Sequence, residues 1–265
     1  MDNGLFLLEE GELWLFAWAL TIPRILGAIV VMPFLSSNTL PGLVRNGVVM
    51  VLSVVAIPMT MEQVKDLPLE ALPLIIIVIK ESILGFMMGF MFSIPFWAVS
   101  AAGYFIDMQR GTMSAEQFAA VITDQTSPLG NVLALMAVTL LFASGGFLLL
   151  YEVLLLSYQT WPIDSYFPKF NMDSVVVILH QLDLLMYTAA LIAGPIVAVM
   201  YLIEVGAALV ARQVPQLNVF LLTMPIKSGV GMLILIYYVT FIANFLREQF
   251  LHFGDSFQIL ERILK

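Results

Sequence analysis

The chain has 265 residues, of which 61% are hydrophobic and 11% charged, with a net charge of −8 and a mean hydropathy of +0.98. A soluble domain carries about 45–50% apolar and about 25% charged residues, so this composition excludes an ordinary water-soluble protein and indicates a single membrane domain over residues 1–265. The negative balance offers no basic surface for nucleic acid, and the absence of cysteine excludes disulfides and thiolate chemistry.

The first half of the chain contains three apolar runs that predict helices, because about 20 apolar residues cross the hydrocarbon core of a bilayer. They cover residues 13–35, 47–61 and 72–106, and the second run is short and closes at Pro58. The third run is long for one straight span and carries Pro95, which removes a backbone donor and is expected to kink the helix.

The second half begins with a polar segment at 107–127, followed by a fourth apolar run at 129–150. Residues 160–181 are mixed and polar, so we expect an exposed loop there. The fifth run, 184–203, contains Pro195, which is expected to bend it.

The sixth run covers residues 228–246, and the tail at 247–265 mixes apolar and charged residues as an interfacial amphipathic helix does. The acidic amino terminus and the basic tail favour opposite sides of the membrane, which six full crossings do not allow. One run is therefore expected to be a hairpin or partial span, with the second and third as candidates. The fold class is predicted to be all-α, with about six apolar helices and kinked hairpins.

Ionisable residues interrupt these apolar runs: Arg24, Lys80, Glu81, Glu204, Arg212 and Lys227. A charge at the bilayer centre costs about 2.5–3.5 kcal/mol on insertion scales. Two interpretations of these charges stay open. In the first, the side chains lie near helix ends and reach the headgroups. In the second, they pair across helices or line a water-filled route. Glu204 and Arg212 are too far apart along a helix to pair directly, so each needs a partner from another helix or chain.

Small residues indicate close helix packing, within the chain or between subunits. Gly85 and Gly89 have the GxxxG spacing, and the pair Gly145 and Gly146 lies within the fourth run.

The sequence contains no residue pattern typical of a catalytic or metal-binding site. His180 and His252 are far apart, without a metal-ligand spacing. Asp107 has no second carboxylate or nucleophile beside it, and we expect all three side chains to be solvated in loops. We therefore expect no catalytic residue, no metal site, no cofactor and no enzymatic activity.

Two stretches carry a resemblance that goes further. The first spans residues 94–111 and reads IPFWAVSAAGYFIDMQRG; the second spans 204–227 and contains PQLN and PIK. Together they resemble the FliR/SctT family, the T component of the type III secretion export apparatus, and the first stretch resembles the injectisome branch more than the flagellar one. Met108 and Val214 depart from the residues usual in that pattern.

The resemblance implies a structural export-gate subunit, similar to a fused R-plus-S unit, within a helical multi-subunit core. Unfolded effector polypeptides are expected to pass through this core, which would sit in the bacterial inner membrane and project toward the periplasm. Expected partners are the R and S subunits, the U (switch) and V (export gate) components, and membrane lipids. The alternatives are a flagellar export-gate subunit and a stand-alone channel or transporter, the latter motivated by the charges within the apolar runs.

The residues expected to carry this function fall into two groups. Gln109, Arg110 and Gly111 are assigned to a loop at the pore or its gate. A polar hairpin with inter-subunit contacts on the cytoplasmic side is assigned to Glu204, Arg212, Pro215, Gln216, Asn218 and Lys227.

Overall fold

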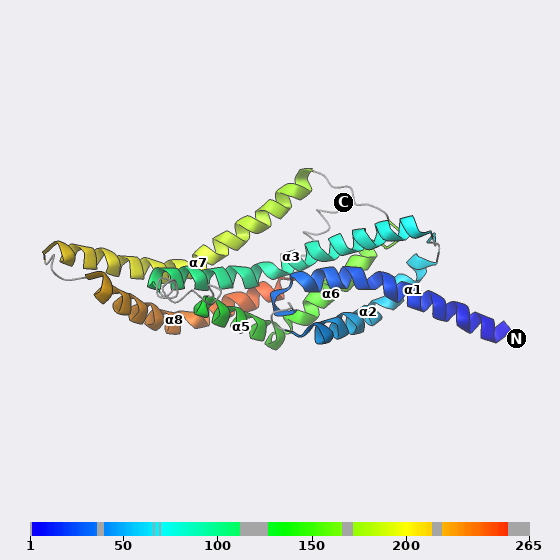
Figure 1. The fold of residues 1–265 in the computed structure, drawn as a ribbon, viewed down its shortest axis with the longest axis horizontal. Helices are drawn as coiled ribbons and strands as arrows, with labels where there is room; N and C mark the ends of the chain where they lie inside the picture. Colours follow the sequence, from blue (N-terminus) through cyan, green and yellow to red (C-terminus); the bar gives the residue numbers. More distant parts are fainter. Residues whose placement is uncertain are drawn as a thin grey trace. The chain divides into compact units, whose positions relative to one another are not determined.

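A computed structural model describes residues 2–35, 40–65, 67–68, 70–111, 127–165, 172–213 and 219–253. Within these ranges every regular element is helical, which confirms the all-α prediction (Figure 1). In chain order the elements are α1 (Asp2–Val31), the 3-10 helix η1 (Pro33–Leu35), α2 (Gly42–Val64), α3 (Ala71–Arg110), α5 (Pro128–Ala143), α6 (Gly146–Thr160), α7 (Met172–Gln213) and α8 (Val219–Leu251).

Five of these helices are long and apolar enough to cross a membrane, and α5 with α6 forms a sixth candidate bent by 74°. The prediction of about six apolar helices is therefore confirmed. The qualifying parts of the five single helices are Gly11–Val31, Gly42–Val64, Ala71–Arg110, Leu179–Gln213 and Leu222–Leu251.

The bend between α5 and α6 corrects the expectation of one uninterrupted fourth run. α5 ends at Ala143 with Ser144 as its C-cap, and Gly145 follows with φ +76°, a left-handed conformation that glycine adopts without a steric penalty. An added Cβ at Gly145 would meet nothing within 4 Å, so the turn, not helix packing, accounts for this glycine. The fourth run is thus broken by a turn, whereas α2 and α3 are each one helix long and apolar enough to cross a membrane.

Helix boundaries also differ from the apolar runs. α7 begins at Met172, so the second half of the expected loop at 160–181 is helical. α8 begins at Val219 and includes Pro225, and α3 continues through Arg110 into the expected polar segment. Residues 247–251 extend α8. The rest of the proposed amphipathic tail, from 254 onward, lies outside the described residues.

The chain forms two compact units. The first consists of Met1–Ser93, Gly145–Gln181 and Leu251–Lys265, and the second of Ile94–Ser144 and Leu182–Phe250. The core of the first unit includes the fully buried side chains of Ile25, Ile57, Ile77, Phe92 and Tyr158. The core of the second includes those of Phe96, Ile106, Leu141, Ile196 and Phe250.

Glycines allow α1 and α3 to cross with their backbones in contact in the first unit. A Cβ at Gly85 would overlap the carbonyl oxygen of Arg24, and one at Gly89 would overlap that of Ala28. On the α1 side, a Cβ at Gly27 would lie 2.6 Å from the carbonyl oxygen of Ser82. Since no larger residue fits, these glycines set the distance at which side chains of α1 and α3 meet.

A similar approach occurs between α3 and α5 in the second unit. A Cβ at Gly103 would lie 2.6 Å from the backbone nitrogen of Gly130. Gly103 is one turn before Asp107, so this crossing brings the end of α3 to the first turn of α5.

Candidate functional site

A buried ion cluster, made of Arg24, Lys80 and Glu81, lies within the first unit. The Nε of Arg24 in α1 donates to Oε2 of Glu81 in α3 at 2.6 Å, and Nη2 donates to Oε1 at 2.9 Å. Neither side chain is exposed. A guanidinium that binds both oxygens of a carboxylate makes one of the stronger polar contacts in proteins, so this pair joins the two helices at their close crossing.

Lys80 adds a second cation to the same carboxylate. Its Nζ lies 2.9 Å from Oε1 of Glu81 and donates to the carbonyl oxygens of Pro162 at 3.0 Å, Ile163 at 3.1 Å and Ser165 at 2.8 Å. The ammonium thus binds the turn that follows α6, and its side chain is 2% exposed.

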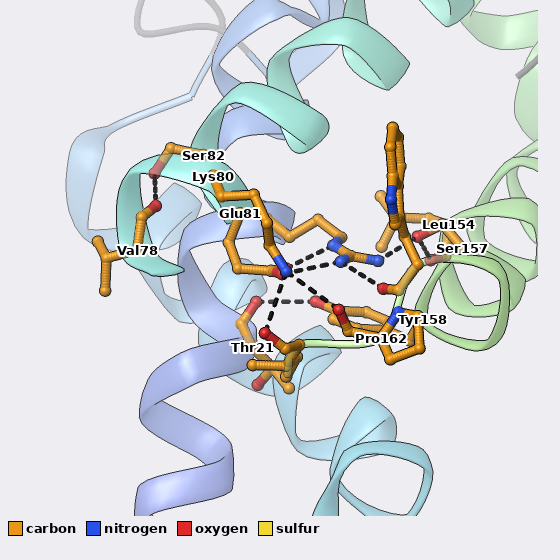
Figure 2. Close-up of polar contacts among 12 residues, drawn as sticks. Thr21, Val78, Lys80, Glu81, Ser82, Leu154, Ser157, Tyr158 and Pro162 are labelled. Atoms are coloured by element: carbon orange, nitrogen blue, oxygen red, sulfur yellow. Dashed lines mark hydrogen bonds and ion pairs between the residues drawn. The ribbon is translucent and has the colours of Figure 1, made fainter. Parts of the chain in front are cut away.

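The last turn of α6 completes the surroundings of Arg24, whose Nη1 donates to Oγ of Ser157 at 3.0 Å and whose Nη2 donates to the carbonyl oxygen of Trp161 at 2.9 Å. The guanidinium carbon is 4.1 Å from the ring centroid of Tyr158, whose hydroxyl donates to the carbonyl oxygen of Thr21. Figure 2 shows Lys80 and Glu81 of α3 facing Ser157 and Tyr158 of α6 and the turn at Pro162. Because helix carbonyls at a carboxyl end carry partial negative charge, two cations are favoured there.

These contacts decide between the two interpretations of the charges in the first unit. Arg24, Lys80 and Glu81 do not reach toward headgroups from helix ends, since all three are buried and paired across helices. The pairing fastens α6 and its following turn to the α1–α3 crossing, which is a structural role.

A second polar group, here called the α3-end cluster, lies within the second unit. It consists of Asp107, Gln109, Arg110, Glu204, Lys227 and Ser228. Its members come from the last turns of α3, from α7 and from α8.

Asp107 is the buried centre of the α3-end cluster, and the expectation of a solvated loop residue is wrong for it. Its Oδ1 is 2.9 Å from Nη1 of Arg110, and its Oδ2 accepts from the hydroxyl of Ser127 at 2.7 Å and from the backbone N–H of Leu129 at 2.8 Å. Ser127 in turn caps α5 by accepting from the N–H of Gly130. A carboxylate is favoured here, because unpaired N–H groups at a helix amino end attract negative charge.

Arg110 and Gln109 tie the end of α3 to the other two helices. The Nε and Nη2 of Arg110 donate to Oγ of Ser228 in α8 at 3.1 and 2.9 Å. Nε2 of Gln109 donates to Oε2 of Glu204 at 3.0 Å, and Nζ of Lys227 lies 3.2 Å from the same oxygen. Lys227 is 7% exposed and Glu204 44%, so this ion pair borders the surface.

The structure thus brings together residues that the sequence placed in separate groups. Gln109 and Arg110 belong to the last turn of α3, not to a loop, and Glu204 and Lys227 of the expected polar hairpin contact or neighbour them. Gly111 follows with φ +83° and ends the helix. The partner that Glu204 requires is confirmed to come from another helix.

The remaining predicted residues have different positions. Arg212 is exposed in the last turn of α7, and no residue of the described ranges pairs with it. Gly146 is buried at the start of α6. Pro215, Gln216 and Asn218 lie outside the described residues.

Three residues that contribute polar contacts to the two clusters were not identified from the sequence: Asp107, Ser127 and Ser157. A usable signal existed for the first two, because Asp107 and Arg110 have the i,i+3 spacing of a helical ion pair and Ser127 precedes a proline as an N-cap residue does. Ser157 carries no such local signal. In the part of the chain that the structure describes, no group of three His, Cys, Asp or Glu side chains is arranged to hold a metal ion.

The chain is similar to known bacterial export proteins over nearly its whole length. A family model described as bacterial export proteins, family 1, matches residues 15–253, which include both clusters. Yop proteins translocation protein T of Yersinia pestis is 36% identical over 252 residues, 95% of this chain and 96% of that protein. Surface presentation of antigens protein SpaR of Salmonella typhimurium is 30% identical over 247 residues, 92% and 91% of the two chains. Flagellar biosynthetic protein FliR of Bacillus subtilis is 29% identical over 239 residues, 88% and 90%.

Proposed function

The chain belongs to the family of bacterial export proteins, family 1, and on this premise we propose that it is a structural subunit of a type III secretion export gate. The observation that carries the proposal is the family match over residues 15–253 together with 36% identity to a Yop translocation protein. The chain would form, with R and S subunits, the entry pore for unfolded secreted proteins.

The injectisome branch is favoured over the flagellar branch. The translocation protein of Yersinia pestis shares 36% of aligned residues, whereas the flagellar FliR proteins of Bacillus subtilis and Escherichia coli share 29% and 23%. The secreted polypeptides would then be effectors, and a role in virulence would follow.

The α3-end cluster is the part of the molecule that we assign to the gate. Asp107, Arg110 and Gln109 connect the end of α3 to α5, α7 and α8 through buried or half-buried polar contacts. A rigid polar junction of this kind suits a site that positions a pore loop, because its members hold one another in fixed rotamers. Gly111 supplies the left-handed residue at which the chain leaves the helix.

The buried ion cluster has a different role in this proposal. Arg24, Lys80 and Glu81 hold α6 against α1 and α3 and have their charges satisfied within the chain. A scaffold that is stiff at this point would let the exposed apolar helix faces meet partner subunits and lipids without rearranging. In this proposal Arg24, Lys80 and Glu81 have a structural role only, and the subunit would act without catalysis.

The proposed location is the bacterial inner membrane, with the chain as a multi-pass protein whose core projects toward the periplasm. The apolar helices support a membrane location, and the family supports an assembly that also includes the U and V components.

Deletion with complementation tests the proposal. Removing the gene should abolish secretion of effectors and leave motility intact, and the tagged chain should co-purify with small hydrophobic subunits in mild detergent, as seen by native mass spectrometry. Intact secretion after deletion, together with a chain that purifies alone, would refute it. Solute flux through the purified chain in liposomes would instead favour a stand-alone channel.

A further inference from the structure

Glu152 is an exposed carboxylate near the middle of the apolar helix α6. It lies six residues after Gly146 and eight before Thr160, between runs of leucine and valine. No described residue forms an ion pair or a hydrogen bond with it. Within the bent α5–α6 candidate span, this carboxylate is therefore far from either end.

Other acidic residues of the candidate spans differ from Glu152 in one of two ways. Glu81 and Asp107 are buried and paired, and Glu204 is paired with Lys227. The exposed ones lie within four residues of the end of a candidate span: Glu12, Glu62, Asp183 and Glu248. Glu152 is neither paired nor terminal.

The face that carries Glu152 is continuous along the helix. Leu148, four residues earlier, is 71% exposed, and Gln159, seven residues later, is also exposed. Residues with these spacings share one side of an α-helix. The opposite side packs inside the first unit through Val153, Leu154 and Tyr158.

A carboxylate on such a face is unfavourable against lipid chains, because a charged group in hydrocarbon loses its hydration without a compensating partner. An anionic headgroup would repel it. A cation delivered on an apolar helix satisfies both the charge of Glu152 and the apolar surface around Leu148.

We propose that the exposed face of α6 docks an apolar helix of another subunit that presents a lysine or arginine to Glu152. This inference rests on the proposed function, since it requires an assembled complex. It adds to that function a specific contact, the charge of the partner group and the helix that receives it.

A photo-crosslinking residue at position 148 of the full chain, one turn before Glu152 on the same exposed face, leaves the carboxylate in place and tests the contact in cells that produce the whole secretion apparatus. The crosslinked peptide should come from an apolar helix of another subunit, with a lysine or arginine inside that helix within one turn of the crosslink. Crosslinks to lipid alone, or to a segment without such a cation, would overturn the proposal.

Charge variants give an independent readout. Glu152→Lys should lower the yield of co-purified subunits about tenfold, as expected when a buried interfacial pair is replaced by like charges. Glu152→Gln should have a smaller effect, and the charge-reversal control Glu62→Lys, at an exposed position near the end of α2, almost none. Size-exclusion profiles of each variant expressed alone show whether it folds.

The two experiments distinguish a failure of the contact at Glu152 from a failure of the proposed function. If the unaltered chain gathers no partner, the proposed function fails. If it assembles and Glu152→Lys assembles equally well, the contact at Glu152 is refuted while the function stands.

Discussion

The carboxylate of Glu81 accepts two hydrogen bonds from the guanidinium of Arg24, at 2.6 and 2.9 Å, where neither side chain is exposed. Desolvating two charges is costly, and a buried pair is tolerated only when its geometry and its remaining hydrogen bonds are nearly complete. Ser157 and the carbonyl oxygen of Trp161 bind further donors of Arg24. The first unit should therefore be most sensitive to substitutions that remove one member and leave the others buried.

Glu81→Gln is expected to destabilise the protein by about 3–5 kcal/mol, because it leaves two buried cations without their counter-ion. The measurement is thermal unfolding of the purified chain in detergent. Glu62→Gln is the matched control, since Glu62 is exposed near the end of α2, and it should shift stability by less than about 0.5 kcal/mol. Equal effects of the two variants would contradict the role of the ion cluster.

Lys80→Met is expected to loosen the turn after α6, because the carbonyl oxygens of Pro162, Ile163 and Ser165 lose a common donor. Hydrogen–deuterium exchange should become faster at residues 161–165, with less change in α1 and the first part of α3. Lys65→Met, at an exposed position after α2, serves as the control. Unchanged exchange at the turn would show that the ammonium does not hold it.

Apolar composition alone was enough to predict the helices, because each candidate span needs only a sustained apolar run. The position of the break at Gly145 was not predictable in this way, since a glycine pair within such a run also fits close helix packing. The turn became clear only from the positive φ at Gly145 and the empty space around it.

The charged partners were harder to predict for a different physical reason. Arg24 and Glu81 are 57 residues apart, so no local periodicity links them. Their pairing depends on the close crossing of α1 and α3. Gly85 permits this crossing, but a glycine in the sequence does not show which residues of the two helices lie opposite each other. Asp107 was misjudged because the polar residues after it suggested a loop, whereas the i,i+3 pair with Arg110 extends the helix.

Gly85→Ala should destabilise the first unit, because the added methyl group would overlap a backbone carbonyl that no side-chain rotation can move. Overpacking of this kind costs about 1–3 kcal/mol. Gly229→Ala in α8 is the matched control, with nothing within 4 Å of the new methyl group, and should stabilise the helix by about 0.5–1 kcal/mol. A stabilising Gly85→Ala would disprove the close crossing. The yield of monodisperse protein and its thermal unfolding show whether each variant is destabilised or stabilised.

Asp107→Ala and Glu204→Gln should differ in effect although both remove a carboxylate from the α3-end cluster. Asp107 is fully buried and accepts from Arg110, Ser127 and the N–H of Leu129, so its loss leaves buried donors unsatisfied at about 1–3 kcal/mol. Glu204 is 44% exposed, and the amide oxygen of a glutamine at this position still accepts from Lys227 or Gln109, so the expected cost is below about 1 kcal/mol.

Thermal unfolding of the two variants under the same conditions measures this contrast. Ser127→Ala, which removes the cap of α5 and one donor to Asp107 together, should cost about 1 kcal/mol. If the cluster positions a gate, Glu204→Gln should alter secretion while the assembled complex purifies normally, because the contacts of Gln109 and Lys227 change without unfolding the second unit. Normal secretion by Glu204→Gln, with secretion lost only in variants that also lose stability, would assign the α3-end cluster to folding alone.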